Sequence, residues 1–405
     1  MMKLENVYGT SFIRLVLGAV LLAAASSRQA AAEGPSLKKP SLENSDPNGV
    51  IQWTRKIYED GKWNATPDIV HWKGHYYVCI NQGPIHNGLD DPVIVLRSSD
   101  LKEWEHIYTT TGPPENGAAV DCKFVALPER LILTYQYMDR PGGTTPALLN
   151  VPQNSDDRNY VETRVVYTED GKHWSKSQRV HEPLHNFWKA KVRDGVMYVA
   201  SDYVNVGRTD YVLAREEQNS KLFRIDLVSS TDGLEWKKVS AIFKDPPRSI
   251  TETALTFRPD GELWALTRQN FLSRSRPPYK EWTTELAELE GGGVGGPEMI
   301  AIGDDVYLAG RFYGYLANHG PPDSPQTDKF ATSLWKFNHA AGKFERIADL
   351  PRPCFADMGY AGFVQTKDGV FVVHYSGHAY EEANLARGHY NEQTDIYLSK
   401  LKLGK

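Results

Sequence analysis

Cysteine is scarce in this chain of 405 residues, which has only Cys79, Cys122 and Cys354. No two of them form a CxxC pair, so the sequence indicates neither a disulfide framework nor a thiolate zinc site. One pair could still form a disulfide in an oxidising compartment. The 12 histidines do not group at the spacings of metal ligands either. We therefore expect no metal ion and no cofactor.

Runs of positive charge are also lacking. The chain has 46 Lys and Arg against 51 Asp and Glu, a formal net charge of -5. Proteins that follow a nucleic-acid backbone present a basic stripe or cluster, and none is found here. Nucleic acid is therefore not an expected partner.

Long apolar runs are absent except near the N-terminus. There, residues 15–25 are almost entirely apolar, follow Lys3 and Arg14, and precede the small side chains of residues 30–32. This pattern predicts a signal peptide over residues 1–32, with an uncleaved N-terminal anchor as the alternative. We expect a flexible leader over 33–49, then a single domain over 50–405. The mature protein would be secreted or periplasmic, with no membrane partner; the sequence gives no indication of oligomeric state.

Aromatic and turn-forming residues are abundant, with 10 Trp, 21 Tyr, 33 Gly and 24 Pro. This composition is typical of short aromatic strands divided by frequent turns, and it predicts an all-β protein. One turn phrase occurs three times, at residues 98–104, 168–174 and 229–236. In each copy a strand is followed by Ser or Thr, then Asp, a turn residue and Trp. The Asp carboxylate can accept hydrogen bonds from turn amides while the Trp packs on the next strand.

A second repeat alternates with the first and sets the number of blades. It consists of an apolar strand, a turn that usually contains Gly, and an aromatic strand. The copies lie at residues 68–78, 123–137, 189–200, 255–267, 299–310 and 363–374. If each copy is the inner hairpin of a blade, the chain forms a six-bladed β-propeller with four-stranded antiparallel blades, closed by residues 395–401. Five or seven blades are the alternatives.

The turn phrases resemble the Asp-box turns of bacterial sialidases, and the order of polar residues at inner-strand ends is similar to that family over the whole mature length. Glu252 and Arg268 are 16 residues apart, Arg311 closes a later strand, and Tyr360 begins the last blade. The resemblance implies a glycoside hydrolase acting on a glycan, with Tyr360 as nucleophile and Glu252 as its base. A phenol is a poor nucleophile until a carboxylate takes its proton. Arg268 and Arg311 would hold a substrate carboxylate.

The same resemblance places the general acid on the loop that contains His86, Asp90 and Asp91. Either carboxylate could be the acid, and so could His86, which is otherwise a substrate contact. Adjacent carboxylates repel, so the pKa of one of them could be raised as an acid requires. The sequence does not select among them.

The chain departs from the family at the first of its three arginines. Where sialidases have an Arg-Ile-Pro phrase, this sequence has Ala65-Thr66-Pro67, and Arg55 is too far upstream to replace the arginine. The set of three arginines that would bind a sialic acid carboxylate is therefore incomplete. A neutral sugar or a uronic acid from a plant or algal polysaccharide is the better expectation.

Four further residues begin inner strands and are second-rank candidates for substrate binding: Asp68, Asp121, Trp188 and Lys189. Asp68 also matches an aspartate in other carbohydrate-active propellers, although it could instead be a structural carboxylate. Two functions outside hydrolysis remain open. A polysaccharide lyase could use Tyr360 or a histidine to abstract a proton beside a uronate carboxylate, and a noncatalytic propeller could simply bind glycans.

Overall fold

The computed structural model describes residues 46–84, 91–110, 117–139, 161–204, 223–244, 250–312, 331–350, 358–387 and 392–404. The predicted signal peptide and most of the predicted leader lie outside these ranges. The chain separates into a first unit, Met1–Ser41, and a second unit, Leu42–Lys405, which contains every described residue.

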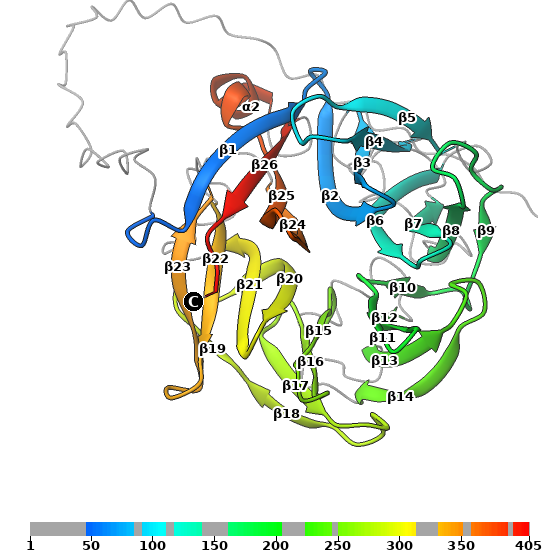
Figure 1. Ribbon diagram of the computed structural model, residues 1–405, viewed down its shortest axis with the longest axis vertical. Coiled ribbons are helices and arrows are strands. Elements are labelled where there is room, and N and C mark those ends of the chain that lie inside the picture. Colours follow the sequence, from blue (N-terminus) through cyan, green and yellow to red (C-terminus); the bar gives the residue numbers. More distant parts are fainter. Residues whose placement is uncertain are drawn as a thin grey trace, which may run out of the picture. The chain divides into compact units, whose positions relative to one another are not determined.

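The second unit is a six-bladed β-propeller, as the repeats predict (Figure 1). Blade 1 contains β2 (Trp63–Trp72), β3 (His75–Gly83), β4 (Val93–Ser98) and β5 (Glu105–Thr109). Blade 2 contains β6 (Gly117–Ala126), β7 (Leu131–Asp139), β8 (Val161–Thr168) and β9 (Gln178–Arg179). In blade 3 the inner strand is split into β10 (His185–Phe187) and β11 (Lys191–Arg193), followed by β12 (Val196–Val204), β13 (Phe223–Ser230) and β14 (Lys237–Phe243).

Blade 4 contains β15 (Ala254–Phe257), β16 (Leu263–Leu266), β17 (Phe271–Ser275) and β18 (Thr283–Leu286). Blade 5 contains β20 (Val294–Ile302), β21 (Asp305–Phe312), β22 (Ala331–Asn338) and β23 (Lys343–Asp349), with the short β19 (Glu288–Leu289) parallel to β23. The inner hairpins of all six blades coincide with the six repeats in the sequence.

Blade 6 joins the two ends of the domain. It contains β24 (Gly359–Thr366), β25 (Gly369–Ser376) and β26 (Asp395–Leu401), and its outermost strand is β1 (Ile51–Tyr58). β1 is antiparallel to β26, and the Thr54 and Ser399 hydroxyls lie 2.7 Å apart. The sequence correctly predicts residues 395–401 as the closing strand, but it gives no sign that β1 completes the blade.

The core is divided among the blades. Six clusters of buried apolar side chains each fill one interface between neighbouring blades. The largest fully buried side chains include Trp63, in the cluster between blades 6 and 1, and Trp188 and Trp335, which share the cluster between blades 4 and 5. Because each blade covers the apolar face of the next, ring closure leaves no blade face exposed to water.

The three repeated turns have the hydrogen bonds that the sequence predicts. Asp100 Oδ1 accepts the amides of Lys102 and Glu103, at 2.8 and 3.0 Å. Asp170 and Asp232 accept the equivalent amide pairs. The tryptophans that follow, Trp104, Trp174 and Trp236, each pack in the cluster shared with the preceding blade. These turns therefore help to fix neighbouring blades together.

Helix is confined to one place in the described part of the chain, between β25 and β26. The 3-10 turn η4 (His378–Tyr380) leads into α2 (Glu381–Arg387). Within the described ranges, no helix has the length and apolar character needed to cross a membrane.

Candidate active site

Four of the inner strands have a distorted residue at the same level, near the end where the strand begins, and β15 has one two residues before its first residue. These residues have positive φ angles: Thr66 (46°), Asp121 (52°), Glu252 (55°), Gly296 (55°) and Tyr360 (47°). For β2, β6, β20 and β24 the pairing register shifts at this point, as in a β-bulge. The left-handed region is unfavourable for residues other than Gly, so its use by four such residues makes this level the candidate functional site.

Tyr360 and Glu252 meet at this level, although they lie on different blades. The Tyr360 hydroxyl donates to Glu252 Oε1 at 2.8 Å. Arg268 Nη1 donates to the same oxygen at 2.6 Å, and the Gly296 amide donates to Oε2 at 2.8 Å. The carboxylate of Glu252 is thus oriented by three donors, one of which is the phenol it would deprotonate.

Arg311 lies against the other side of this group. Its guanidinium carbon is 5.3 Å from the centre of the Tyr360 ring, and its Nε donates to the Met358 carbonyl at 2.6 Å. A second nitrogen, Nη2, lies 3.4 Å from the Tyr375 hydroxyl. The side chain is buried and held in place. Of the residues predicted from the sequence, Tyr360, Glu252, Arg268 and Arg311 are therefore brought together.

The surroundings keep the Tyr360 phenol protonated. Burial raises its pKa well above the usual value of 10, and the charge of Glu252 raises it further. Arg268 and Arg311 act in the opposite direction but are outweighed. At neutral pH the side chain is a phenol, so it can attack an electrophile only if Glu252 removes the proton during the step.

Asp121 also belongs to this group, because its carboxylate is near enough to raise the pKa of the Tyr360 phenol. Trp188 forms the wall beside it. The Trp188 ring lies 5.8 Å from the Tyr360 ring, and its Nε1 donates to the Pro297 carbonyl at 2.8 Å. Trp188 is only 1% exposed, so it supports the Tyr360 ring from the core side.

Asp202 is a part of the site that the sequence did not reveal. This buried side chain on β12 accepts the Glu252 amide through Oδ2 and the Thr253 hydroxyl through Oδ1, the latter at 3.0 Å. It thereby holds Glu252 in its left-handed conformation. Burial raises the pKa of Asp202 to about 7. Its only sequence signal was a charged residue within a mostly apolar inner strand.

Asp68 and Lys189 lie deeper, where inner strands approach the propeller axis. Lys189 Nζ donates to Asp68 Oδ1 at 2.6 Å and to the Phe363 carbonyl at 3.2 Å. The other Asp68 oxygen accepts the Phe124 amide at 2.8 Å. The Asp68 side chain is fully buried. Its observed contacts thus connect blades 1, 2, 3 and 6, whereas the predicted contact with substrate stays a prediction.

The predicted general acid is only partly described. His86 and Asp90 lie outside the described residues. Asp91 is 1% exposed, and its carboxylate packs against Gly83, where an added Cβ would come within 2.3 Å of Asp91 Oδ1. Its backbone carbonyl accepts the Ala119 amide of blade 2.

At the position of the missing arginine the chain has Ala65, which is fully buried and lies one residue before the bulge of blade 1. Thr66 occupies the bulge of blade 1, is 5% exposed, and its carbonyl lies 3.5 Å from the Cys122 thiol. Arg55 lies on β1, the outermost strand of blade 6, where its guanidinium covers the Trp53 ring at 4.3 Å. Arg55 therefore does not replace the first arginine.

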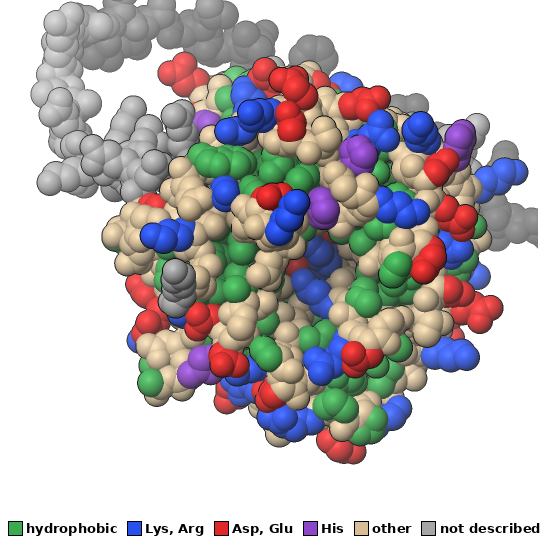
Figure 2. Space-filling model, viewed as in Figure 1, with side chains coloured by type: hydrophobic (Ala, Val, Ile, Leu, Met, Phe, Trp, Pro, Cys, Tyr) green, Lys and Arg blue, Asp and Glu red, His purple; other side chains and the backbone are tan. Residues whose placement is uncertain are grey.

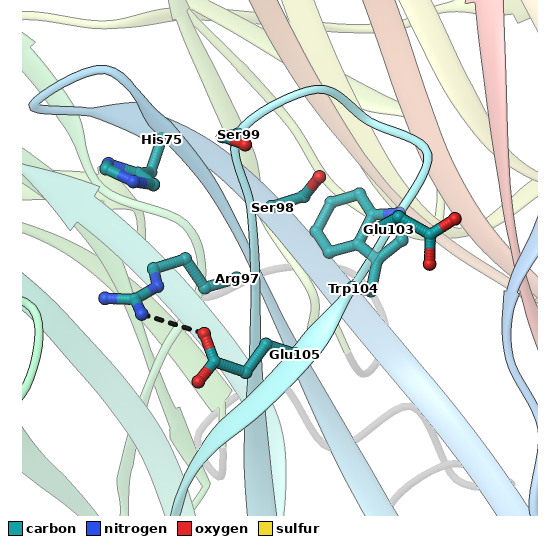
Figure 3. Close-up of a pocket in the computed structure, with 7 residues that line it drawn as sticks. All are labelled: His75, Arg97, Ser98, Ser99, Glu103, Trp104 and Glu105. Atoms are coloured by element: carbon teal, nitrogen blue, oxygen red, sulfur yellow. Dashed lines mark hydrogen bonds and ion pairs between the residues drawn. The ribbon is translucent and has the colours of Figure 1, made fainter.

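A separate hollow of about 280 Å³ lies on the outer part of blade 1 (Figure 3). Its lining includes His75, Trp104 and the ion pair between Arg97 and Glu105, at 2.8 Å. Ser98, which also lines it, pairs with Tyr76 beside the β2–β3 turn, at the opposite end of the blade from Thr66. The hollow is thus remote from the Tyr360 group. In the part of the chain that the structure describes, no three His, Cys, Asp or Glu side chains are grouped to hold a metal ion.

Solved structures support the fold. The chain is similar to Trypanosoma rangeli sialidase in complex with the inhibitor DANA, with a TM-score of 0.58 and 13% identity over 84% of this chain and 55% of that one. Phage phi92 endosialidase gives 0.57 and 12%, over 87% and 69%. Penicillium chrysogenum alpha-L-arabinanase complexed with arabinobiose gives 0.53 and 11%, over 86% and 97%.

The chain thus spans little more than half the length of the trypanosomal sialidase. No protein-family model and no curated protein sequence matches it. At these identities the likeness concerns the fold, and the reaction must be argued from the site itself.

Proposed function

We propose that this protein is a secreted, exo-acting glycoside hydrolase that cleaves a terminal acidic sugar from a glycan or polysaccharide. The observation that carries the proposal is the hydrogen bond from the Tyr360 phenol to Glu252, beside Arg268 and Arg311. A nucleophile, its base and two cations for a carboxylate therefore lie within one group.

In the proposed reaction the Tyr360 oxygen attacks the anomeric carbon as Glu252 takes the phenolic proton. The glycosidic bond breaks, and an acid on the loop of residues 86–91 protonates the departing oxygen. Water then attacks the anomeric carbon and gives a proton to the same loop group, which now acts as base. The bond between Tyr360 and the sugar breaks, and Glu252 returns its proton to the phenolate oxygen. A neutral phenol suits an anionic sugar, because it approaches without the repulsion that a carboxylate nucleophile would meet.

Arg268 and Arg311 would bind the substrate carboxylate with two guanidinium groups, where a sialidase uses three. This difference favours a substrate whose carboxylate is placed differently from that of a sialic acid. A uronic acid has its carboxylate on a ring carbon away from the reacting centre, whereas in a sialic acid the carboxylate is attached to the anomeric carbon itself. With buried Ala65 where sialidases have their first arginine, this side of the site carries no charge from that position. We therefore propose uronic acid glycosides as the first substrate class to test.

The test is product analysis by mass spectrometry with uronate-containing polysaccharides, aryl uronides and sialosides. Tyr360→Phe and Glu252→Gln should each reduce release of a saturated sugar by at least about 100-fold, because each removes one partner of the proton transfer. Tyr76→Phe is the matched control. The Tyr76 hydroxyl also lies near a carboxylate, Asp368 at 3.3 Å, but at the other end of blade 6. The activity of the Tyr76→Phe variant should therefore be unchanged.

Two other outcomes would contradict the proposal. An unsaturated uronate would identify a lyase, since elimination leaves a double bond in the sugar. Absence of any product, together with glycan binding that survives both substitutions, would indicate a noncatalytic binding module.

A further inference from the structure

A cluster of charged side chains surrounds the propeller axis beneath Trp188. It contains Asp68, Lys123, Lys189, Lys191 and Glu298, from inner strands or bulges of blades 1, 2, 3 and 5. Figure 2 shows Lys and Arg side chains inside the hollow at the centre of the face in view. The cluster thus places three ammonium groups and two carboxylates in the interior of the ring.

Four of these five groups are paired. Lys189 bonds Asp68 at 2.6 Å and lies 3.5 Å from Glu298. Lys191 lies 2.5 Å from Glu298 and also donates to the Met299 carbonyl at 2.9 Å. Both carboxylates therefore have lysine partners that are not Lys123.

Lys123 is the exception. It is 3% exposed, and within the described residues its ammonium has no hydrogen-bond acceptor. The ammonium lies over the face of the Trp188 ring, with Nζ 4.8 Å from the ring centre. A cation–π contact leaves the three N–H donors of an ammonium unsatisfied, and an unpaired charge is costly to bury.

We infer that the propeller axis holds a bound monovalent anion, a halide or a carboxylate, which accepts a hydrogen bond from Lys123. The anion would satisfy the unpaired donor and balance the excess positive charge of the cluster. Trp188 contacts both Lys123 and the Tyr360 ring, so the inferred site lies next to the Tyr360 group, but its donor is Lys123 and not Arg268 or Arg311. The inference does not depend on the proposed hydrolysis.

A bridging water is the competing explanation. Glu298 Oε2 is also buried without a hydrogen-bond partner in the described part of the molecule. One water could donate to Glu298 and accept from Lys123, without any anion. The experiment must therefore separate a bound ion from water.

The test uses bromide as the probe. A ligand that binds only the folded state raises the melting temperature in proportion to the logarithm of its concentration above Kd, by about 4 °C for a domain of this size at a hundredfold excess over Kd. We expect this response in the wild-type protein and its loss in Lys123→Met. Lys336→Met is the matched control: its ammonium lies 2.8 Å from Asp305 on the exposed surface, and the bromide response should remain.

Anomalous diffraction from bromide-containing crystals gives an independent result, with a peak expected beside Lys123 Nζ. If Lys123→Met fails to fold, Lys123→Arg should keep the response and the wild-type crystals still decide the question. Repeating the titration with glucuronate separates the sources: a response to glucuronate but not to bromide assigns the site to a sugar carboxylate. Parallel bromide and glucuronate responses in wild type and Lys123→Met, with no anomalous peak, would overturn the inference in favour of water.

Discussion

The ion pair between Lys189 and Asp68 allows a strong prediction, because it is buried and joins distant parts of the ring. Replacing Lys189 by Met leaves the Asp68 carboxylate, which is fully buried, with the Phe124 amide as its remaining described donor. Breaking a buried pair in this way costs about 3 to 5 kcal/mol. For a domain of this length, that corresponds to a fall in melting temperature of about 4 to 7 °C.

The matched control is Arg276→Met. Arg276 contacts Asp260 at 3.0 Å and Glu262 at 3.7 Å, so it also serves two carboxylates, but its side chain is 61% exposed. An exposed pair contributes about 0 to 1 kcal/mol, so its melting temperature should change by less than about 2 °C. Calorimetry on both variants measures the difference.

A double variant tests whether the cost comes from the unpaired charge. Asp68→Asn combined with Lys189→Met removes both charges while the Asn carbonyl can still accept the Phe124 amide. The double variant should recover at least half of the fall in melting temperature that Lys189→Met causes. If Lys189→Met is no more harmful than Arg276→Met, or if the double variant is worse than the single one, the reasoning is refuted.

Three further predictions concern support for the site and blades. Because burial raises the pKa of Asp202 to about 7, above about 3.9 in the unfolded chain, stability should fall as pH rises from about 4 to 7 and then level; Asp202→Asn should remove that component in melting curves over this range, and an unchanged pH profile would contradict it. Gly362→Ala should greatly lower the yield of folded protein, measured by gel filtration, because the new Cβ would lie 2.4 Å from Asp68 Oδ1 and 2.8 Å from its Cα. Asp232→Ala should cost about 1 to 3 kcal/mol in calorimetry because two turn amides lose their acceptor; a neutral result would show that water replaces it.

The fold was predictable because its signals are local. Each Asp turn is decided within a few residues by hydrogen bonds such as those of Asp100 to the following amides. Each inner hairpin has its own apolar strands and turn. Six copies in sequence leave few arrangements other than a ring. The identity of the outermost strand of blade 6 was not predictable in this way, because β1 reads as an ordinary strand until the ring brings β26 beside it.

The site was predictable only in part. The order of Glu252, Arg268, Arg311 and Tyr360 pointed to one group, and their contacts agree with it. Lys123 and Asp202 gave no comparable signal. Each is one of two polar residues in a mostly apolar strand, and its importance depends on neighbours more than 40 residues away, such as Glu252 for Asp202.

The pairing of β1 with β26 also has a kinetic consequence. Thr54 and Ser399, which meet in that pair, are separated by 345 positions. At a synthesis rate of roughly 5 to 20 residues per second, β1 emerges roughly 20 to 70 seconds before its partner exists. During that interval the unpaired edge of β1 can pair with a strand edge of another nascent chain as readily as with one of the same chain. Synthesis of β26, the last strand made, therefore ends the period in which β1 is at greatest risk of aggregation.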